Sequence, residues 1–199
     1  MKEQSENKKK ILECSIRLFA LKGFNGASIR EIAKDVGTTV PNIYYYYGNK
    51  ERLYNHILET TNKEFSQTIQ NASAAAASLG DRLVAMTIAK YRFIDKHPER
   101  MRIFFREWFA PENGTETEKE VRPNFMQVLA TMAYIVNDSI ARGETKNVDP
   151  EHAAWVLVGV FNAFDLGFIA MGIIPSDEEI KAVSTLALEG LLSDGSKFI

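Results

Sequence analysis

Side chains that can donate hydrogen bonds to anionic oxygens gather in one short stretch of the 199-residue chain. Hydroxyl, amide and cationic groups follow one another there: Ser28, Arg30, Thr39, Asn42, Tyr44, Tyr45, Tyr46 and Lys50. Phosphate oxygens accept hydrogen bonds from such groups, and a guanidinium can also pair with two acceptors on the edge of a guanine. These residue types therefore favour recognition of a polyanion.

Charge is distributed unevenly along the chain. The formal net charge is only −2 at pH 7, which by itself argues against a generally basic nucleic-acid binder. Residues 1–63, however, hold 11 Lys and Arg against 7 Asp and Glu, a balance of +4, whereas residues 64–199 hold 13 against 19, a balance of −6. The positive charge lies where the donors lie, as attraction to phosphate groups requires.

Residue patterns typical of enzymes do not occur in the sequence. The three histidines, His56, His97 and His152, form no pair at metal-ligand spacing, and there is neither a Gly-x-Ser-x-Gly motif nor a glycine-rich phosphate loop. We therefore expect no enzyme activity, no metal site and no cofactor. The one cysteine, Cys14, lies on an apolar helix face and cannot form an intrachain disulfide, so we expect a small buried hydrophobic residue in a chain suited to the reducing cytoplasm.

Two short capped helices must position the donors. Ser28 and the glutamate three residues later form a capping box that opens one helix, and Gly37 ends it. Thr39 can accept a hydrogen bond from the free N–H groups of the next helix, whose first turn tolerates Pro41. This pattern predicts a helix-turn-helix over about 28–47. Its tight turn leaves the second helix projecting, the shape that enters a DNA major groove.

The flanking segments add two more amphipathic helices. Upstream, apolar residues recur at helical spacing from Ile11 onward, until Gly23 ends that helix. Downstream, Asn49 can cap a helix with its own apolar face. The order of helix, Gly-Phe, helix-turn-helix, tyrosine cluster, Asn-Lys and helix resembles the TetR family of bacterial transcriptional regulators over about residues 8–60.

The resemblance implies a set of DNA contacts. The recognition helix is Thr39 to about Tyr47, with the Tyr47 ring packed in the core. Four consecutive tyrosines cannot all face the groove, and the orientation of Tyr45 is left open. Lys50 matches the family's DNA-backbone lysine, and Arg30 matches a position that can reach a guanine edge. Val40 stands where the family often carries a polar residue, so it can touch a thymine methyl group but forms no hydrogen bond to a base. The expected contacts are Ser28, Arg30, Thr39, Val40, Pro41, Asn42, Tyr44, Tyr45, Tyr46 and Lys50.

The rest of the chain is expected to be helical as well, because no alternating strand pattern bounded by hairpin turns occurs. Proline, glycine and capping residues divide it into helices over about 50–69, 81–96, 98–109, 117–142, 150–174 and 177–192. Residues 72–77 are either a frayed continuation of the first of these helices or a connection of small residues. We expect Pro123 to delay or kink the fourth of these. The prediction is an all-α protein of about nine helices, with a three-helix DNA-binding domain at 1–65 and a helical ligand-binding and dimerisation domain at 66–199.

One predicted helix is apolar on nearly every side. Residues 153–174 approach the length that a bilayer requires, but Asp165 near the middle costs about 2.5–3.5 kcal/mol on insertion, and Asn162 adds to that cost. In a soluble protein such a helix must be covered by its own core and by another subunit. We therefore expect no membrane partner and a homodimer formed through about 151–173 and 177–192. Gly159 and Gly167 would allow close backbone approach of the first helix, and the second is expected to present Leu186, Leu188, Leu191 and Leu192 to the partner.

The middle of the chain is rich in methionine and aromatic residues, a pattern that is usually simple core. TetR-like proteins, however, place a ligand cavity among these helices, and such pockets have apolar walls with a few polar groups. The resemblance implies that a small apolar or amphipathic effector binds near Phe104, Phe105, Arg106, Trp108, Phe125, Asn162 and Asp165. Asn162 and Asp165 can equally form hydrogen bonds across a dimer seam.

Together these features predict a cytoplasmic, homodimeric and ligand-responsive transcriptional repressor. It binds a palindromic operator in double-stranded DNA, and a small effector releases it. The alternative is a constitutive or architectural DNA-binding dimer without an effector. A buried cavity lined by the aromatic residues favours the regulator, and a fully packed core favours the architectural protein.

Overall fold

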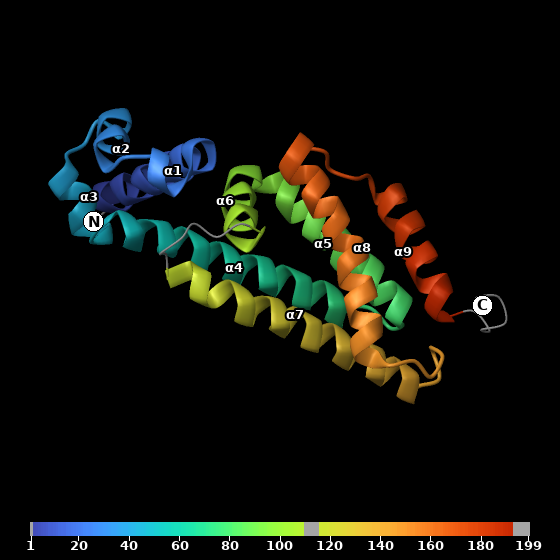
Figure 1. Cartoon of the computed structure of the whole chain (residues 1–199). Helices are drawn as coiled ribbons and strands as arrows, with labels where there is room; N and C mark the ends of the chain where they lie inside the picture. The colour runs from blue at the N-terminus through green and yellow to red at the C-terminus, as the bar shows by residue number, and fades with distance from the viewer. Residues whose placement is uncertain (1, 110–115, 193–199) are drawn as a thin grey trace. The chain divides into compact units, whose positions relative to one another are not determined.

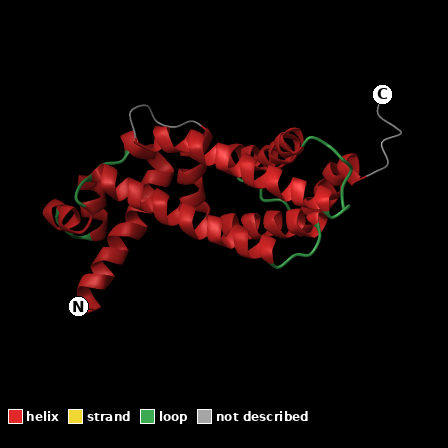
Figure 2. Cartoon of the chain, turned by 90° about the horizontal axis from the view of Figure 1, so that it is seen from below, coloured by secondary structure: helices red, strands yellow, loops and turns green. Residues whose placement is uncertain are grey.

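The computed structural model describes residues 2–109 and 116–192, and every regular element in these ranges is a helix (Figure 1, Figure 2). The described helices are α1 (Lys2–Gly26), α2 (Ile29–Val36), α3 (Val40–Tyr47), α4 (Lys50–Ala74), α5 (Leu79–Lys96), α6 (Pro98–Phe109), α7 (Glu116–Ala141), α8 (Pro150–Met171) and α9 (Asp177–Leu192). The chain forms two compact units, one bounded by Met1–Glu64 and His97–Glu118, the other by Phe65–Lys96 and Lys119–Ile199. The all-α prediction is confirmed for the described ranges.

The predicted capping box opens α2. The Ser28 hydroxyl oxygen accepts a hydrogen bond from the Glu31 N–H at 3.2 Å, and the Glu31 carboxylate accepts one from the Ser28 N–H at 3.0 Å. At the other end, Gly37 takes a φ of 73°, which a residue with a β-carbon rarely adopts. Its N–H bonds back to the carbonyls of Ala33 and Lys34, so the helix ends where the sequence predicts.

The second helix of the motif starts after a very short turn. The Thr39 hydroxyl oxygen accepts a hydrogen bond from the Asn42 N–H at 3.3 Å, and Pro41 occupies the first turn of α3, where no intrahelical donor is lost. Since α2 ends at Val36 and α3 begins at Val40, the helix-turn-helix prediction is confirmed.

One apolar core holds the first unit together. It is built by α1, α2, α3, α4 and α6, and its fully buried members are Ile11, Phe19, Ile32, Ile43, Leu53, Tyr54 and Ile103. Gly23 interrupts α1 with a φ of 74° and a ψ of 177°, which agrees with the predicted break. Cys14 is buried as predicted, and this burial raises the pKa of its thiol. Less thiolate forms as a result, which disfavours redox chemistry at this residue.

Helix α6 belongs to the first unit, although the predicted DNA-binding domain ended at residue 65. The Arg100 guanidinium on α6 donates to the Thr61 hydroxyl at 3.0 Å and pairs with the Glu64 carboxylate at 2.7 Å. The Tyr54 hydroxyl donates to the buried Glu107 carboxylate at 2.6 Å. Polar contacts therefore fix α6 to the first part of α4.

The second unit buries an ion pair beside its apolar core. The core joins α5, α7, α8 and α9 through buried residues such as Leu83, Val136 and Leu157. The Lys90 ammonium lies 2.6 Å from the Asp165 carboxylate, and the two side chains are only 15% and 3% exposed. The Tyr91 hydroxyl donates to the same carboxylate at 3.0 Å. Burial and the adjacent carboxylate raise the pKa of Tyr91, so its hydroxyl remains a donor.

Several helix bounds differ from the predicted ones. Helix α4 continues past Ile69 to Ala74, which agrees with the alternative of a longer helix, and α5 begins at Leu79 rather than Asp81. The earlier start has a local cause, because the Ser78 hydroxyl oxygen accepts a hydrogen bond from the Asp81 N–H at 3.1 Å and caps α5. Helix α7 begins at Glu116, so Pro123 does not delay its start, and the alternative that it kinks the helix stays a prediction.

The long apolar helix α8 has a cap at each end. The Asp149 carboxylate accepts a hydrogen bond from the His152 N–H at 2.9 Å, which holds the pKa of this carboxyl below its usual range. Gly172 ends the helix with a φ of 70°. Over the described parts of the chain, no helix is long and apolar enough to cross a membrane.

Candidate nucleic-acid interface

The helix-turn-helix presents half of the predicted contact residues at its surface. Arg30, Thr39, Pro41, Tyr44 and Tyr45 are exposed, with Tyr45 the most accessible tyrosine of the cluster at 77%. The hydroxyl groups of Thr39 and the two tyrosines and the guanidinium of Arg30 can donate to phosphate oxygens or to base edges. Tyr47 is only 8% exposed, which confirms its predicted place in the core.

The other predicted contacts are half-buried and also shape the motif. Ser28 belongs to the capping box, and the Asn42 amide donates to the Thr38 hydroxyl oxygen at 2.8 Å. Val40 and Tyr46 pack against the core of the first unit. These residues therefore set the geometry of the turn, whatever they contact outside the chain.

Lys50 lies against an aromatic ring at the start of α4. Its ammonium is 4.4 Å from the centroid of the Phe24 ring, within the range of a cation–π interaction. The Asn49 side chain accepts a hydrogen bond from the Arg52 N–H at 2.8 Å and caps the helix, as predicted. The packing of Phe24 against Lys50 was not predicted from the sequence. The Gly-Phe pair at the end of the first helix was the only local pattern that pointed to this residue.

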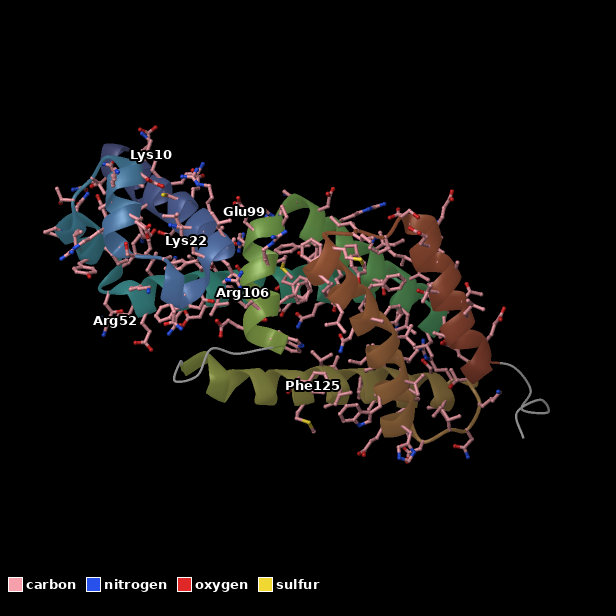
Figure 3. All side chains as sticks on the ribbon, turned by 45° about the horizontal axis from the view of Figure 1, so that its top comes forward. Lys10, Lys22, Arg52, Glu99, Arg106 and Phe125 are labelled. Atoms are coloured by element: carbon pink, nitrogen blue, oxygen red, sulfur yellow. The ribbon has the colours of Figure 1, made fainter. Side chains whose placement is uncertain are left out.

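Four of the predicted effector residues, Phe104, Phe105, Arg106 and Trp108, lie on α6 in the first unit. The Phe104 and Trp108 rings stack with centroids 5.8 Å apart, and Phe105 is buried. Figure 3 shows Arg106 pointing from α6 toward α1, where its guanidinium donates to the carbonyl oxygens of Phe19 and Ala20 at 3.0 and 2.9 Å. Two of its donors are therefore engaged by backbone oxygens.

The remaining predicted effector residues lie in the second unit. The Phe125 ring packs against Trp155 with centroids 5.6 Å apart. Asn162 is half-buried, and Asp165 is buried with its carboxylate bound to Lys90 and Tyr91. Lys90 was missed in the sequence because no local pattern links residues 75 positions apart. The effector-contacting roles of all seven positions stay a prediction.

Family models match both parts of the chain. Residues 11–67 match the model of the tetR family of bacterial regulatory proteins, and residues 76–191 match that of the tetracyclin repressor-like C-terminal domain. The chain belongs to the TetR family. It is therefore a transcriptional regulator by family, with a DNA-binding helix-turn-helix, and not a member of an enzyme family.

Individual relatives support this placement of the TetR-family chain. The probable HTH-type transcriptional regulator YttP of Bacillus subtilis (strain 168) is 31% identical over 102 residues, which cover 50% of this chain and 49% of YttP. The match thus spans about half the length of that relative.

Solved structures share the fold. A TetR-like transcriptional regulator from Rhodococcus sp. RHA1 superposes with a TM-score of 0.75 at 20% identity, covering 92% of this chain and 94% of the other. AibR, solved in complex with isovaleryl coenzyme A and operator DNA, superposes with a TM-score of 0.68 at 20% identity, covering 92% and 96%.

Proposed function

We propose that this TetR-family chain is a cytoplasmic, homodimeric repressor that binds a palindromic operator in double-stranded DNA and is released by a small apolar or amphipathic effector. The observation that carries the proposal is the exposed donor surface of the helix-turn-helix, with Arg30, Tyr44 and Tyr45 accessible and Lys50 at the start of α4. A surface of this kind fits phosphate and base-edge acceptors.

An exposed apolar face on α8 supports dimerisation. Four apolar residues recur on this face at helical spacing and are exposed: Trp155, Gly159, Leu166 and Ala170. Trp155 is 55% and Leu166 52% exposed. A β-carbon built at Gly159 would meet no atom within 4 Å, so the backbone is open to close approach by another helix. Contiguous exposed apolar side chains of this kind mark an association surface.

Helix α9 contributes less apolar surface than its sequence suggested. Leu186 is 69% exposed, but Leu188 is only 5% exposed because it packs in the core of the second unit. The expectation that Leu188 faces a partner was therefore wrong. The side chains of Leu191 and Leu192, which were expected to share this surface, lie outside the described side chains. We assign the larger part of the dimer surface to α8.

A two-fold dimer determines the form of the operator. Two copies of the recognition helix, α3, enter successive major grooves when they lie about 34–36 Å apart, so the half-sites are inverted repeats spaced by one helical turn or a multiple of it. Sedimentation of the free chain and of its complex with a selected operator tests this part. A dilute, stable monomer that binds such a site tightly would contradict it.

The proposed effector is an apolar or amphipathic molecule, and AibR, with its bound isovaleryl coenzyme A, gives an example of that chemistry on the same fold. To release DNA, the effector must bind the arrangement that does not bind DNA more tightly, by typically about 1–3 kcal/mol of coupling. By the same linkage, operator DNA must weaken effector binding by the same factor.

This reciprocity provides the experiment. Acyl coenzyme A thioesters and free fatty acids are titrated into the chain while tryptophan fluorescence is recorded, and each hit is titrated again with operator present. Trp108 is half-buried and Trp155 is exposed, so Trp155→Phe leaves a single reporter on α6. A hit whose affinity is unchanged by operator is a passive occupant. If no ligand changes operator affinity, the constitutive dimer is the better description.

A further inference from the structure

The N-terminal helix α1 carries a basic run that the proposed DNA contacts do not use. Lys8, Lys9 and Lys10 are all exposed and follow one another in the first third of the helix. Three consecutive helical residues point in directions about 100° apart, so they cannot share one face. Their surroundings distinguish them.

Lys8 contacts Tyr47, the last residue of the recognition helix α3. The Tyr47 hydroxyl donates a hydrogen bond to the Lys8 carbonyl oxygen at 3.0 Å, across 39 residues of sequence. The Lys8 ammonium also lies 5.7 Å from the centroid of the Tyr47 ring. Because Tyr47 is only 8% exposed and belongs to the core, this turn of α1 is held against the end of α3.

The helical repeat places the three lysines differently. Ile11 and Ser15, three and seven residues after Lys8, are fully buried, so Lys8 borders the packed side of α1. Lys9 points away from that side, and its ammonium lies 3.8 Å from the exposed Glu13 carboxylate. Arg52 lies in the first turn of α4. In Figure 3, Lys10 lies on the opposite side of the first unit from Arg52.

We propose that Lys8 is a further DNA-backbone contact, which Tyr47 positions beside the recognition helix. This inference rests on the proposed DNA binding of the chain. An ammonium on a flexible stem acts as a point charge and suits phosphate oxygens rather than the patterned edge of a base. Lys8 would therefore add affinity at every sequence and leave the choice of operator unchanged.

The experiment compares the salt dependence of binding by the full-length chain and by single lysine variants. The probe is a duplex of about 30 base pairs that the wild-type chain selects from a random library, long enough for two half-sites about 34–36 Å apart. A scrambled duplex of the same length measures the sequence-independent part. Each neutralised phosphate contributes about 0.9 to the slope of log K against log salt concentration.

We expect Lys8→Ala to reduce this slope by about one unit per subunit on both duplexes, and Lys8→Arg to retain it. Lys9→Ala and Lys10→Ala remove the same charge from neighbouring positions and are expected to leave the slope nearly unchanged. An unchanged slope for Lys8→Ala overturns the inference. An equal reduction for all three variants also overturns it, because it would indicate a diffuse field rather than a contact.

A double-mutant cycle tests the positioning role of Tyr47. Tyr47→Phe removes the hydroxyl that bonds to Lys8 and is expected to weaken DNA binding in the wild-type background but not in Lys8→Ala. Equal losses in both backgrounds would assign Tyr47 a purely structural role and overturn the positioning claim. If the wild-type chain selects no duplex, the proposed function fails; selection by wild type with no effect of Lys8→Ala refutes this inference alone.

Discussion

The Lys50 ammonium lies 4.4 Å from the centroid of the Phe24 ring, which itself packs on Tyr54 with centroids 5.0 Å apart. The Tyr54 hydroxyl in turn donates to the buried Glu107 carboxylate on α6 at 2.6 Å. Lys50 is thus part of a series of contacts within the first unit and not a solvated charge at the end of a flexible side chain. A cation held in this way loses less conformational freedom when it binds an anion.

We predict that Lys50→Ala weakens binding to all DNA sequences by a similar factor. Loss of one phosphate contact in each subunit should reduce the slope of log K against log salt concentration by about one unit per subunit. Binding titrations over a salt series measure this slope. Lys63→Ala removes the same charge from an exposed position on α4 and serves as the control. An unchanged slope for Lys50→Ala would exclude the phosphate contact.

Arg30→Ala should act on specificity instead. Arg30 is exposed at the second residue of α2, and a guanidinium that pairs with a guanine edge discriminates by about 1–3 kcal/mol. We expect the variant to lose its preference at one base position in each half-site and to retain the others. Affinities for a set of operators with single base changes show this directly. A uniform loss of affinity would indicate that Arg30 binds phosphate.

The helix-turn-helix could be predicted from sequence because its determinants are local. The capping box at Ser28, the left-handed Gly37 and the cap at Thr39 each act within a few residues of the turn that they set. Local caps and breakers of this kind also located most of the later helices. Their information does not depend on how distant segments pack.

Contacts between distant residues could not be predicted in the same way. Arg106 was predicted from the family resemblance to be one of the polar residues near an effector. In the structure it donates to the carbonyls of Phe19 and Ala20, more than 80 residues away along the chain. A sequence does not distinguish an arginine that can bind a ligand from one that caps a helix. Its acceptors depend on which backbone oxygens the fold brings close to the guanidinium.

The buried ion pair of the second unit should be sensitive to loss of either partner. Lys90 and Asp165 are 15% and 3% exposed, so a single neutral substitution leaves an uncompensated buried charge. We expect Lys90→Met or Asp165→Asn to lower the free energy of unfolding by about 3–5 kcal/mol, and Lys90→Met with Asp165→Leu to lower it less. Urea denaturation measures each value. Equal losses in the double and single variants would contradict this account.

Alkaline pH should destabilise the first unit through Tyr47. Burial raises the pKa of this phenol to about 12, whereas in the unfolded chain it ionises at about pH 10. The unfolded state therefore loses its proton first, and the stabilising contribution is present below about pH 10 and declines as pH rises toward 12. We expect Tyr47→Phe to lessen this decline when urea midpoints are compared across pH. An identical decline in the variant would assign it to other groups.

The dimer surface can be tested by a substitution that the isolated chain tolerates. Gly159 is exposed in the middle of α8, and an added β-carbon there would meet no atom within 4 Å. Gly159→Glu also replaces a weak helix former by a better one, so the fold should be retained. A charge at this position would be buried without a partner in the proposed dimer, and we expect sedimentation to show a monomer with unchanged helix content. Tyr134→Glu, at a residue on α7 that is 72% exposed, is the control and should remain dimeric. If Gly159→Glu stays a dimer, the subunits do not associate through this face of α8.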